Sequence, residues 1–298
     1  MLSALNLNNT QRGTIAALCG FLSFAIADAC AKWLGAFYDI SQVIFWTYYI
    51  SLVFGLCLSP FLGGIKKTIN TKKLHIHIGR GICAFGISFF IVSALKGTNS
   101  LPLATLYTIL FLAPFLITIA AIFVYKESVP HKNWFIIALG FLGILLAFRF
   151  GLTDFSINVL YALIALMFIV LLSLLARPLD HNESILSLSF YPNIVILSLL
   201  SVYMLPDIKL PQMQHMPVFL LNGICVTIGL SAIAYGFRIA PFAVVAPIHY
   251  IQMVLALAIG YLIFDDIPDI WMICGGAIII ISGILLIFSK EKPAKRNF

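Results

Sequence analysis

The sequence predicts an all-α polytopic membrane protein whose ten transmembrane helices form two inverted five-helix repeats. Three observations support this fold class. Of the 298 residues, 62% are hydrophobic and only 10% are charged, whereas about a quarter of the residues in a soluble domain are charged. The apolar residues gather into ten segments, each long enough to cross a bilayer at roughly 20 residues per helix. The two halves of the chain also share a pattern of matched positions.

The ten apolar segments are joined by short connections, which leave no room for a soluble catalytic domain. The segments are 13–33, 41–61, 76–95, 102–124, 133–149, 157–176, 187–205, 216–237, 243–264 and 270–289. A short polar loop, residues 151–156, separates the fifth segment from the sixth. We therefore expect one repeat over residues 12–149 and a second over residues 157–289, packed together as one body.

The evidence for a repeat is a set of matched residues 139 positions apart, with Glu127 corresponding to Asp266. The other matches are Pro102 with Pro241, Ala104 with Ala243 and Ile109 with Ile248. An odd number of spans per half makes the second half enter from the opposite side, so the copies should be related by inversion in the membrane plane. Pro114 and Pro247 would each bend a helix in the corresponding segments.

Basic residues set the expected orientation, because lysine and arginine are enriched in cytoplasmic loops. With a cytoplasmic amino terminus, the inner side collects all but four of the 18 basic residues, including the cluster from Lys66 to Lys73. The four exceptions are Lys32, Lys96, Arg149 and Lys209. We expect a multi-pass protein of the bacterial inner membrane with both termini in the cytoplasm.

Charge and cysteine content exclude other classes of partner. The formal charge of +7 does not indicate nucleic-acid binding, because the basic residues lie in short clusters beside apolar segments. The six cysteines are scattered singly, without the spacing of metal ligands. We expect a small-molecule substrate and a surrounding lipid bilayer, with no nucleic acid, metal or cofactor. The oligomeric state is left open.

The strongest candidate site lies in residues 240–269, where His249, Tyr250 and Gln252 closely follow Pro247 in an apolar segment. Polar side chains in such a segment are typical of a cavity or a helix partner, not of a lipid-facing surface. We interpret all three as substrate-binding residues, with His249 and Gln252 sharing a helix face. Because histidine titrates near physiological pH, protons are a candidate coupling ion. The alternative is a neutral His249 that is hydrogen-bonded to a neighbouring helix.

Further candidate substrate-binding residues lie in the first half. Asp28 and Lys32 are four residues apart, in the order that favours an ion pair on one helix face. They would bind substrate or protons, or form only a structural pair near the outer surface. Four aromatic residues offer faces for stacking and cation–π contact: Trp46, Tyr48, Tyr107 and Phe111. For Trp46 the alternative is a position in the aromatic belt at the membrane interface.

Other polar residues receive structural interpretations. Arg80 is expected at a cytoplasmic helix end, where a charge costs little, in a segment whose small residues favour close packing. Arg177 is expected to anchor an inner helix end. Asn222, Thr227 and Ser231 nearly share one stripe, which favours hydrogen bonds between helices over ligand binding.

Three stretches of the chain resemble a known family. They are ADACAKWLGAFYDISQVIF, ALKGTNSLPLATLYTILFLAPF followed by VYKE, and AYGFRIAPFAVVAPIHYIQMVLALAIGYLIFDDIPD. In order and spacing the chain resembles the drug/metabolite transporter superfamily, EamA type, over essentially its full length. It looks most like the bacterial branch with S-adenosylmethionine and riboflavin uptake carriers. The resemblance implies ten helices around a central cavity, with the fifth and tenth at the periphery; His249 stands where many relatives have glutamine or another polar residue.

These observations favour a secondary transporter of a small amphipathic metabolite that works by alternating access. The substrate would be similar to S-adenosylmethionine, a flavin or an amino acid, because many aromatic faces and few fixed charges suit a nitrogen ring or a zwitterion. The alternatives are an exporter of amino acids, drugs or other metabolites, a channel and, more remotely, an intramembrane enzyme. The sequence has no GxxxxGK[ST] loop for ATP-driven transport and no HExxH motif for a metalloprotease.

Overall fold

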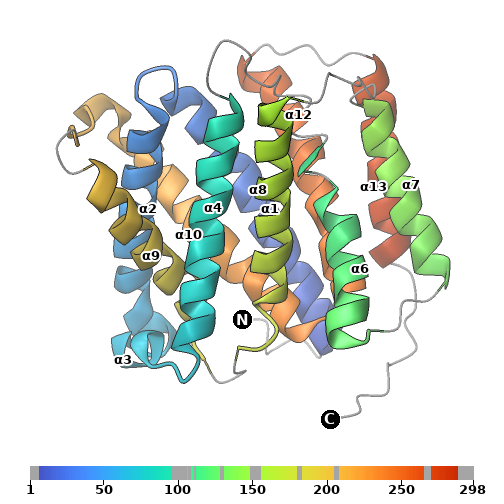
Figure 1. Ribbon diagram of the computed structural model, residues 1–298, viewed down its shortest axis with the longest axis horizontal. Coiled ribbons are helices and arrows are strands. Elements are labelled where there is room, and N and C mark those ends of the chain that lie inside the picture. The colour runs from blue at the N-terminus through green and yellow to red at the C-terminus, as the bar shows by residue number, and fades with distance from the viewer. Residues whose placement is uncertain are drawn as a thin grey trace.

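The computed structural model describes residues 7–95, 106, 109–110, 112–127, 131–147, 156–179, 183–204, 208–264 and 270–287. Within these ranges the chain is helical and contains no strand. The long helices stand side by side in one bundle (Figure 1). They are α1 (Asn9–Leu34), α2 (Ile40–Leu58), α4 (Leu74–Leu95), α6 (Ala113–Tyr125), α7 (His131–Ala147), α8 (Ile157–Leu174), α9 (Ser187–Met204), α10 (Met216–Ile239), α12 (His249–Phe264) and α13 (Ile270–Ile287). Short elements connect them: η1 (Ser59–Leu62), α3 (Ile65–Ile69), η2 (Met213–His215), α11 (Phe242–Val245) and η3 (Ala246–Ile248).

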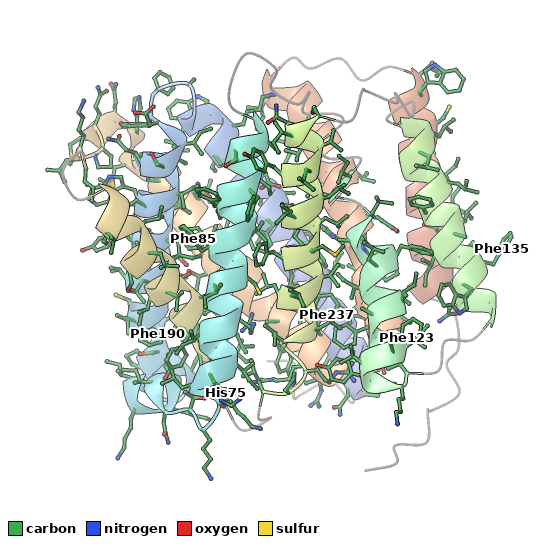
Figure 2. All side chains as sticks on the ribbon, viewed as in Figure 1. His75, Phe85, Phe123, Phe135, Phe190 and Phe237 are labelled. Atoms are coloured by element: carbon green, nitrogen blue, oxygen red, sulfur yellow. The ribbon has the colours of Figure 1, made fainter. Side chains whose placement is uncertain are left out.

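The helices confirm the prediction of an all-α multi-pass membrane protein, since each predicted apolar segment contains one of them. Among the described residues, five helical stretches are long and apolar enough to cross a membrane on their own: Asn9–Leu34, Ile40–Leu62, Leu74–Ile91, Ile157–Leu174 and Met213–Ile239. The exact number of crossings stays a prediction. Phe123 and Phe135 project from the outside of the bundle (Figure 2), and they are 79% and 73% exposed. Such an apolar outer surface suits lipid contact and not water.

Two of the helices begin at side-chain caps. Asn8 precedes α1 and accepts a hydrogen bond from the backbone N–H of Gln11 at 2.8 Å, while the Gln11 side chain accepts from the Asn8 N–H at 3.0 Å. This reciprocal pair satisfies two backbone donors that would otherwise lack a partner at a helix start. Ser156 caps α8 in a similar way, through a bond from the N–H of Val159.

Glycines let α1 and α10 pack at very short range. A Cβ atom added at Gly13 would lie 2.5 Å from the Cβ of Ala240, and one at Gly20 would lie 2.6 Å from Cγ1 of Ile233. No side chain larger than hydrogen fits at either position, and small residues at helix contacts are typical of membrane bundles. The start of α1 therefore lies against the end of α10, so that the two helices run antiparallel.

The largest contacts between helices come in matched pairs. α1 packs against α10 and α12, while α8 packs against α4 and α6. α2 contacts α10, and correspondingly α9 contacts α4. Each helix of the first half has a counterpart five segments later in the sequence: α8 for α1, α9 for α2, α10 for α4, α12 for α6 and α13 for α7. When every helix is replaced by its counterpart, the first contact of each pair becomes the second. The pairs α2 with α9 and α7 with α13 are each their own counterpart under this exchange, and α7 and α13 lie together at one edge of the bundle (Figure 1).

The candidate stretch 240–269 is interrupted as its proline predicts. Pro247 lies in η3, so α11, η3 and α12 form a broken path instead of one regular helix. In the other half, Pro114 is the second residue of α6, directly after a turn at Leu112. Both prolines therefore stand where a regular helix begins anew. Asp265 and Asp266, at the far end of the stretch, lie outside the described residues.

The polar stripe on α10 joins helices, which confirms its structural interpretation. Asn222 donates to Thr47 of α2 at 2.9 Å, and the hydroxyls of Thr227 and Ser51 are 2.8 Å apart. Ser231 donates to Ser189 of α9 at 2.8 Å. All of these side chains are buried, where paired polar groups hold helices in register.

Candidate functional site

A cavity of about 330 Å³ lies inside the bundle. Its volume is at the lower end of the range for small-molecule sites. Its wall draws residues from α1, α2, α4, α6, α8, α10 and α12, and most of them are aliphatic or aromatic. The polar residues in the wall are Asp28, Tyr48, Arg80, Ser88, Ser173, His249 and Gln252. A largely apolar cavity with a few polar groups is the usual form of a binding site for an amphipathic small molecule.

Asp28 and Gln252 meet in this wall. The amide Nε2 of Gln252 donates to Oδ2 of Asp28 at 2.7 Å, although the two residues are 224 positions apart in the sequence. The bond connects α1 to α12. It satisfies part of the hydrogen-bonding capacity of the carboxylate and leaves other lone pairs for a ligand, since an ionised carboxylate has about four acceptor sites.

His249 lies in the same wall, at the first position of α12. Its ring stacks on Phe21 of α1, with the ring centroids 4.7 Å apart and the planes at 16°. This contact presents two stacked rings to the cavity. A flat ligand with a nitrogen ring would extend the stack favourably.

The other predicted residues divide into two groups. Tyr48 lines the cavity. Tyr250 does not: its ring lies so close to Gly140 of α7 that a Cβ there would be 2.9 Å from the Tyr250 Cε2 atom. The proximity of Tyr250 to His249 in the sequence therefore does not place the two side chains together, because neighbouring residues on a helix point to different sides.

Trp46 and Lys32 also lie outside the wall of the cavity. The indole Nε1 of Trp46 donates to the Lys209 carbonyl at 2.9 Å, which ties α2 to the loop before α10. Lys32 is on the exposed surface, one turn beyond Asp28. Its pairing with Asp28 stays a prediction. Tyr107 and Phe111 lie outside the described residues.

Sequence reasoning missed Arg80, Phe21 and Phe24, all of which line the cavity. A usable signal was present for Arg80. Arg80, Ala84 and Ser88 are spaced by four residues and lie in the wall together with Ile87 and Ile91. This spacing defines one face of a helix. A charge on such a face, six residues into an apolar segment, is a functional candidate by default.

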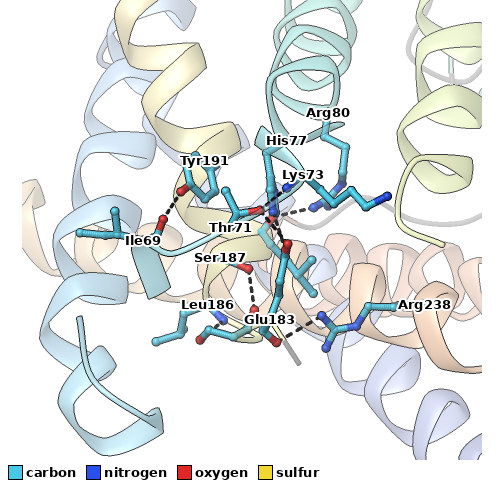
Figure 3. A network of polar contacts seen from close by, with 12 residues as sticks. Ile69, Thr71, Lys73, His77, Arg80, Glu183, Leu186, Ser187, Tyr191 and Arg238 are labelled. Atoms are coloured by element: carbon cyan, nitrogen blue, oxygen red, sulfur yellow. Dashed lines mark hydrogen bonds and ion pairs between the residues drawn. The ribbon is translucent and has the colours of Figure 1, made fainter. Parts of the chain in front are cut away.

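A first polar cluster, the Glu183 cluster, lies beside Arg80 and joins the starts of α4 and α9 to the end of α10 (Figure 3). Oε1 of Glu183 accepts from the Thr71 hydroxyl at 2.6 Å, and Oε2 is 2.8 Å from Nε2 of His77. Arg238 donates to the Glu183 carbonyl at 3.3 Å. Every one of these side chains except that of Thr71 is less than 10% exposed.

A second polar cluster lies at the same end of α10. Arg177 pairs with Glu127 at 2.8 Å and donates to the carbonyls of Phe237 and Ala240 at 2.9 and 2.6 Å. The guanidinium also lies over the Phe242 ring, 4.6 Å from its centroid. Arg177 therefore anchors the ends of three helical elements, which agrees with its predicted anchoring role.

The described residues contain no group of three or more His, Cys, Asp or Glu that is arranged to hold a metal ion. The polar chemistry of the cavity thus consists of a hydrogen-bonded carboxylate, a stacked imidazole, hydroxyls and a guanidinium. These groups recognise and orient a ligand through charge, stacking and hydrogen bonds.

The model of the EamA-like transporter family matches residues 11–149. This match covers nearly all of the first half of the chain. The S-adenosylmethionine uptake transporter of Rickettsia prowazekii (strain Madrid E) is 24% identical over 290 residues, which are 96% of this chain and 97% of that protein. The riboflavin transporter of Vibrio cholerae serotype O1 is 24% identical over 96% of both chains. These relatives and the family confirm the resemblance to the drug/metabolite transporters, and they point to a transporter and not to an enzyme.

One crystal structure of a protein superposes on 93% of this chain and 96% of its own chain, with a TM-score of 0.74 and 17% identity. Similarity at this level establishes the fold alone. It shows that the arrangement of helices seen here is one that another chain adopts over nearly its whole length.

Proposed function

We propose that this chain is a secondary transporter that binds a small amphipathic metabolite in the central cavity and exposes it to the two sides of the membrane in turn. The observation that carries the proposal is the meeting of Asp28 and Gln252 at 2.7 Å in the wall of an otherwise largely apolar cavity. The names of the relatives make S-adenosylmethionine and riboflavin the first ligands to test, with amino acids as a third class. Export of such a metabolite is the alternative direction.

Alternating access is supported by the symmetry of the bundle. We propose that residues 12–149 and 157–289 are inverted repeats, because the helix contacts are exchanged when each helix is replaced by its counterpart. The breaks at Pro114 and Pro247 occupy corresponding segments on either side of the cavity. Paired breaks give two equivalent places at which the bundle can bend.

The experiment that tests the function is a ligand screen followed by transport. The purified protein is heated with S-adenosylmethionine, riboflavin and a set of amino acids, since a ligand that binds only the folded state raises the melting temperature. Each stabilising ligand is then offered to liposomes that contain the protein. We expect saturable uptake of at least one of them. Transport of inorganic ions only, or chemical alteration of a ligand without its movement, would overturn the proposal.

We further propose that the chain lies in the bacterial inner membrane with both termini and the Lys66–Lys73 loop in the cytoplasm, because this orientation places most basic residues inside. A cysteine introduced at Lys67, which is exposed on α3, should resist a membrane-impermeant thiol reagent in intact cells and react after the cells are opened. Strong labelling in intact cells would show the opposite orientation.

Protons are the proposed coupling ion, with His249 as the titrating group in the cavity wall. The variant His249→Gln is therefore expected to keep transport but to lose its dependence on pH, since glutamine keeps a polar side chain that does not titrate. Transport is measured in liposomes with and without a pH gradient.

His215→Gln is the matched control for this prediction. His215 is buried and is bonded to Tyr38 at 2.8 Å, but it does not line the cavity. The control should keep the pH dependence of the wild type. Unchanged pH dependence in His249→Gln would remove His249 from proton coupling, and loss of binding in that variant would assign it to ligand contact instead.

A further inference from the structure

Arg80 is a buried cation in the wall of the cavity. It lies six residues after the start of α4, and only 1% of its surface is exposed. A guanidinium has five N–H donors. The Nη1 group donates to the Leu188 carbonyl at 3.1 Å, and the buried Nε has no hydrogen-bond partner among the described residues. Arg80 therefore retains donor capacity at the surface of a cavity that is otherwise mostly apolar.

The carboxylate of the neighbouring cluster is not bonded to Arg80. Both carboxylate oxygens of Glu183 are engaged by other groups, Oε1 by the Thr71 hydroxyl and Oε2 by His77. Within the described ranges, Arg80 forms no ion pair with a carboxylate. Figure 3 shows Arg80 beside His77 at the edge of the cluster. A buried charge without an ion-pair partner is costly, and inside a membrane such charges mark substrate sites and pathways.

We propose that Arg80 binds a carboxylate of the transported molecule. This inference rests on the proposed transport function and deepens it by naming a group that the substrate must carry. A carboxylate matches the fork of a guanidinium and neutralises its single charge. In a dry wall such a pair is stronger than at a water-exposed surface.

The positions of Arg80 and Asp28 in the cavity also indicate the shape of the ligand. The start of α1 lies against the end of α10, and the end of α10 contacts the Glu183 cluster near the start of α4. α1 and α4 therefore begin on the same side of the bundle. Arg80 lies six residues after the start of α4, whereas Asp28 lies six residues before the end of α1. The two charges thus stand at opposite ends of the cavity.

The substrate class that fits is an elongated molecule with a carboxylate at one end and a cationic or N–H-donating group at the other. The carboxylate binds Arg80, and the donor group binds the free lone pairs of Asp28. Between these ends, the stacked rings of Phe21 and His249 offer a face for an aromatic or heterocyclic part. Amino acids with long side chains and nucleoside-linked amino acids have this arrangement, whereas flavins without an acid group do not.

The test compares ligands that differ only by the carboxylate. The probes are S-adenosylmethionine with its decarboxylated form, and arginine with agmatine, and the dissociation constant of each is measured on the purified full-length protein. We expect the wild type to bind the carboxylated member of a pair about 10- to 100-fold more tightly, because a hydrogen bond to a charged group supplies this order of discrimination. Arg80→Gln should remove the preference, and Arg80→Lys should retain part of it.

Arg238→Gln is the matched control. Arg238 is 3% exposed and joins the same cluster, but it does not line the cavity. It should keep the preference for the carboxylate even where stability falls. The ratio of the dissociation constants of the two ligands in a pair is measured on the wild type alone. The inference can therefore still be refuted if Arg80→Gln does not fold.

Two outcomes separate the inference from the proposed function. If a ligand without a carboxylate is bound and transported, and Arg80→Gln leaves its affinity unchanged, the inference is overturned while the transport function stands. If both members of a pair bind the wild type equally, the inference is likewise overturned. If no small molecule is bound or transported, both proposals fall together.

Discussion

Asparagine in place of Asp28 is expected to reduce substrate transport roughly 10- to 100-fold while leaving the protein folded. Asparagine has nearly the same size and can still accept the bond from Gln252, which is 2.7 Å in the wild type. Only the negative charge in the cavity wall is lost. A cationic or donor group on the substrate would then lose a charge-assisted hydrogen bond, which is about twice as strong as a neutral one. Initial uptake rates in liposomes and thermal unfolding of the same samples measure the two quantities.

Asp39→Asn serves as the comparison for this experiment. Asp39 precedes α2, is exposed, and makes no side-chain capping bond, so its charge should be dispensable. A second variant exchanges Asp28 and Lys32, and a folded protein without transport would assign the charge of Asp28 to the substrate. Wild-type uptake by Asp28→Asn would show that the carboxylate takes no part in transport.

Glutamine in place of Glu183 is expected to lower the free energy of unfolding by about 3 kcal/mol, because removing one member of a buried charge cluster leaves the others uncompensated. The carboxylate is bonded to Thr71 and His77, and the buried Arg238 donates to the Glu183 backbone carbonyl in the same cluster. Glu183 is the one acid among the described residues of this cluster, so its loss leaves the positive charge of Arg238 unopposed. Thermal unfolding in detergent, followed by tryptophan fluorescence, measures the effect.

Thr71→Val provides the graded comparison. It removes one hydrogen bond to the Glu183 carboxylate, at 2.6 Å, but no charge, so it should cost about 1 kcal/mol. If Glu183→Gln unfolds at the wild-type temperature, or if Thr71→Val is the more harmful change, the cluster does not hold these helices together.

The helices could be predicted from the sequence because each one is an apolar run bounded by polar residues. The breaks at Pro114 and Pro247 were also predictable, since a proline inside an apolar run removes a backbone donor. The hydrogen-bonding stripe of Asn222, Thr227 and Ser231 followed from spacing along one helix. All of these features depend on residues that are close together in the chain.

The candidate site was only partly predictable, because its contacts join distant segments. Gln252 was identified from its own helix, but its bond to Asp28 depends on the packing of α12 against α1. Tyr250 was grouped with His249 by proximity, and helical geometry turns it towards α7 instead. Arg80 was assigned to a helix end from its position near the start of a segment. Its place in the cavity wall requires the neighbouring helices to be known.

Because α1 packs tightly against α10 through glycines, the groups of helices that pack together differ from the two halves of the sequence. α1 comes from the first half of the chain and α10 from the second, and α4 and α8 form the equivalent mixed pair. Each lobe of the bundle is therefore assembled from both halves, with α1, α2 and α10 in one lobe and α4, α8 and α9 in the other. The rocking motion of the proposed alternating access would move lobes of mixed origin past one another. Either half of the chain alone supplies only one helix of the α1–α10 pair and one of the α4–α8 pair. A half by itself therefore cannot form either lobe.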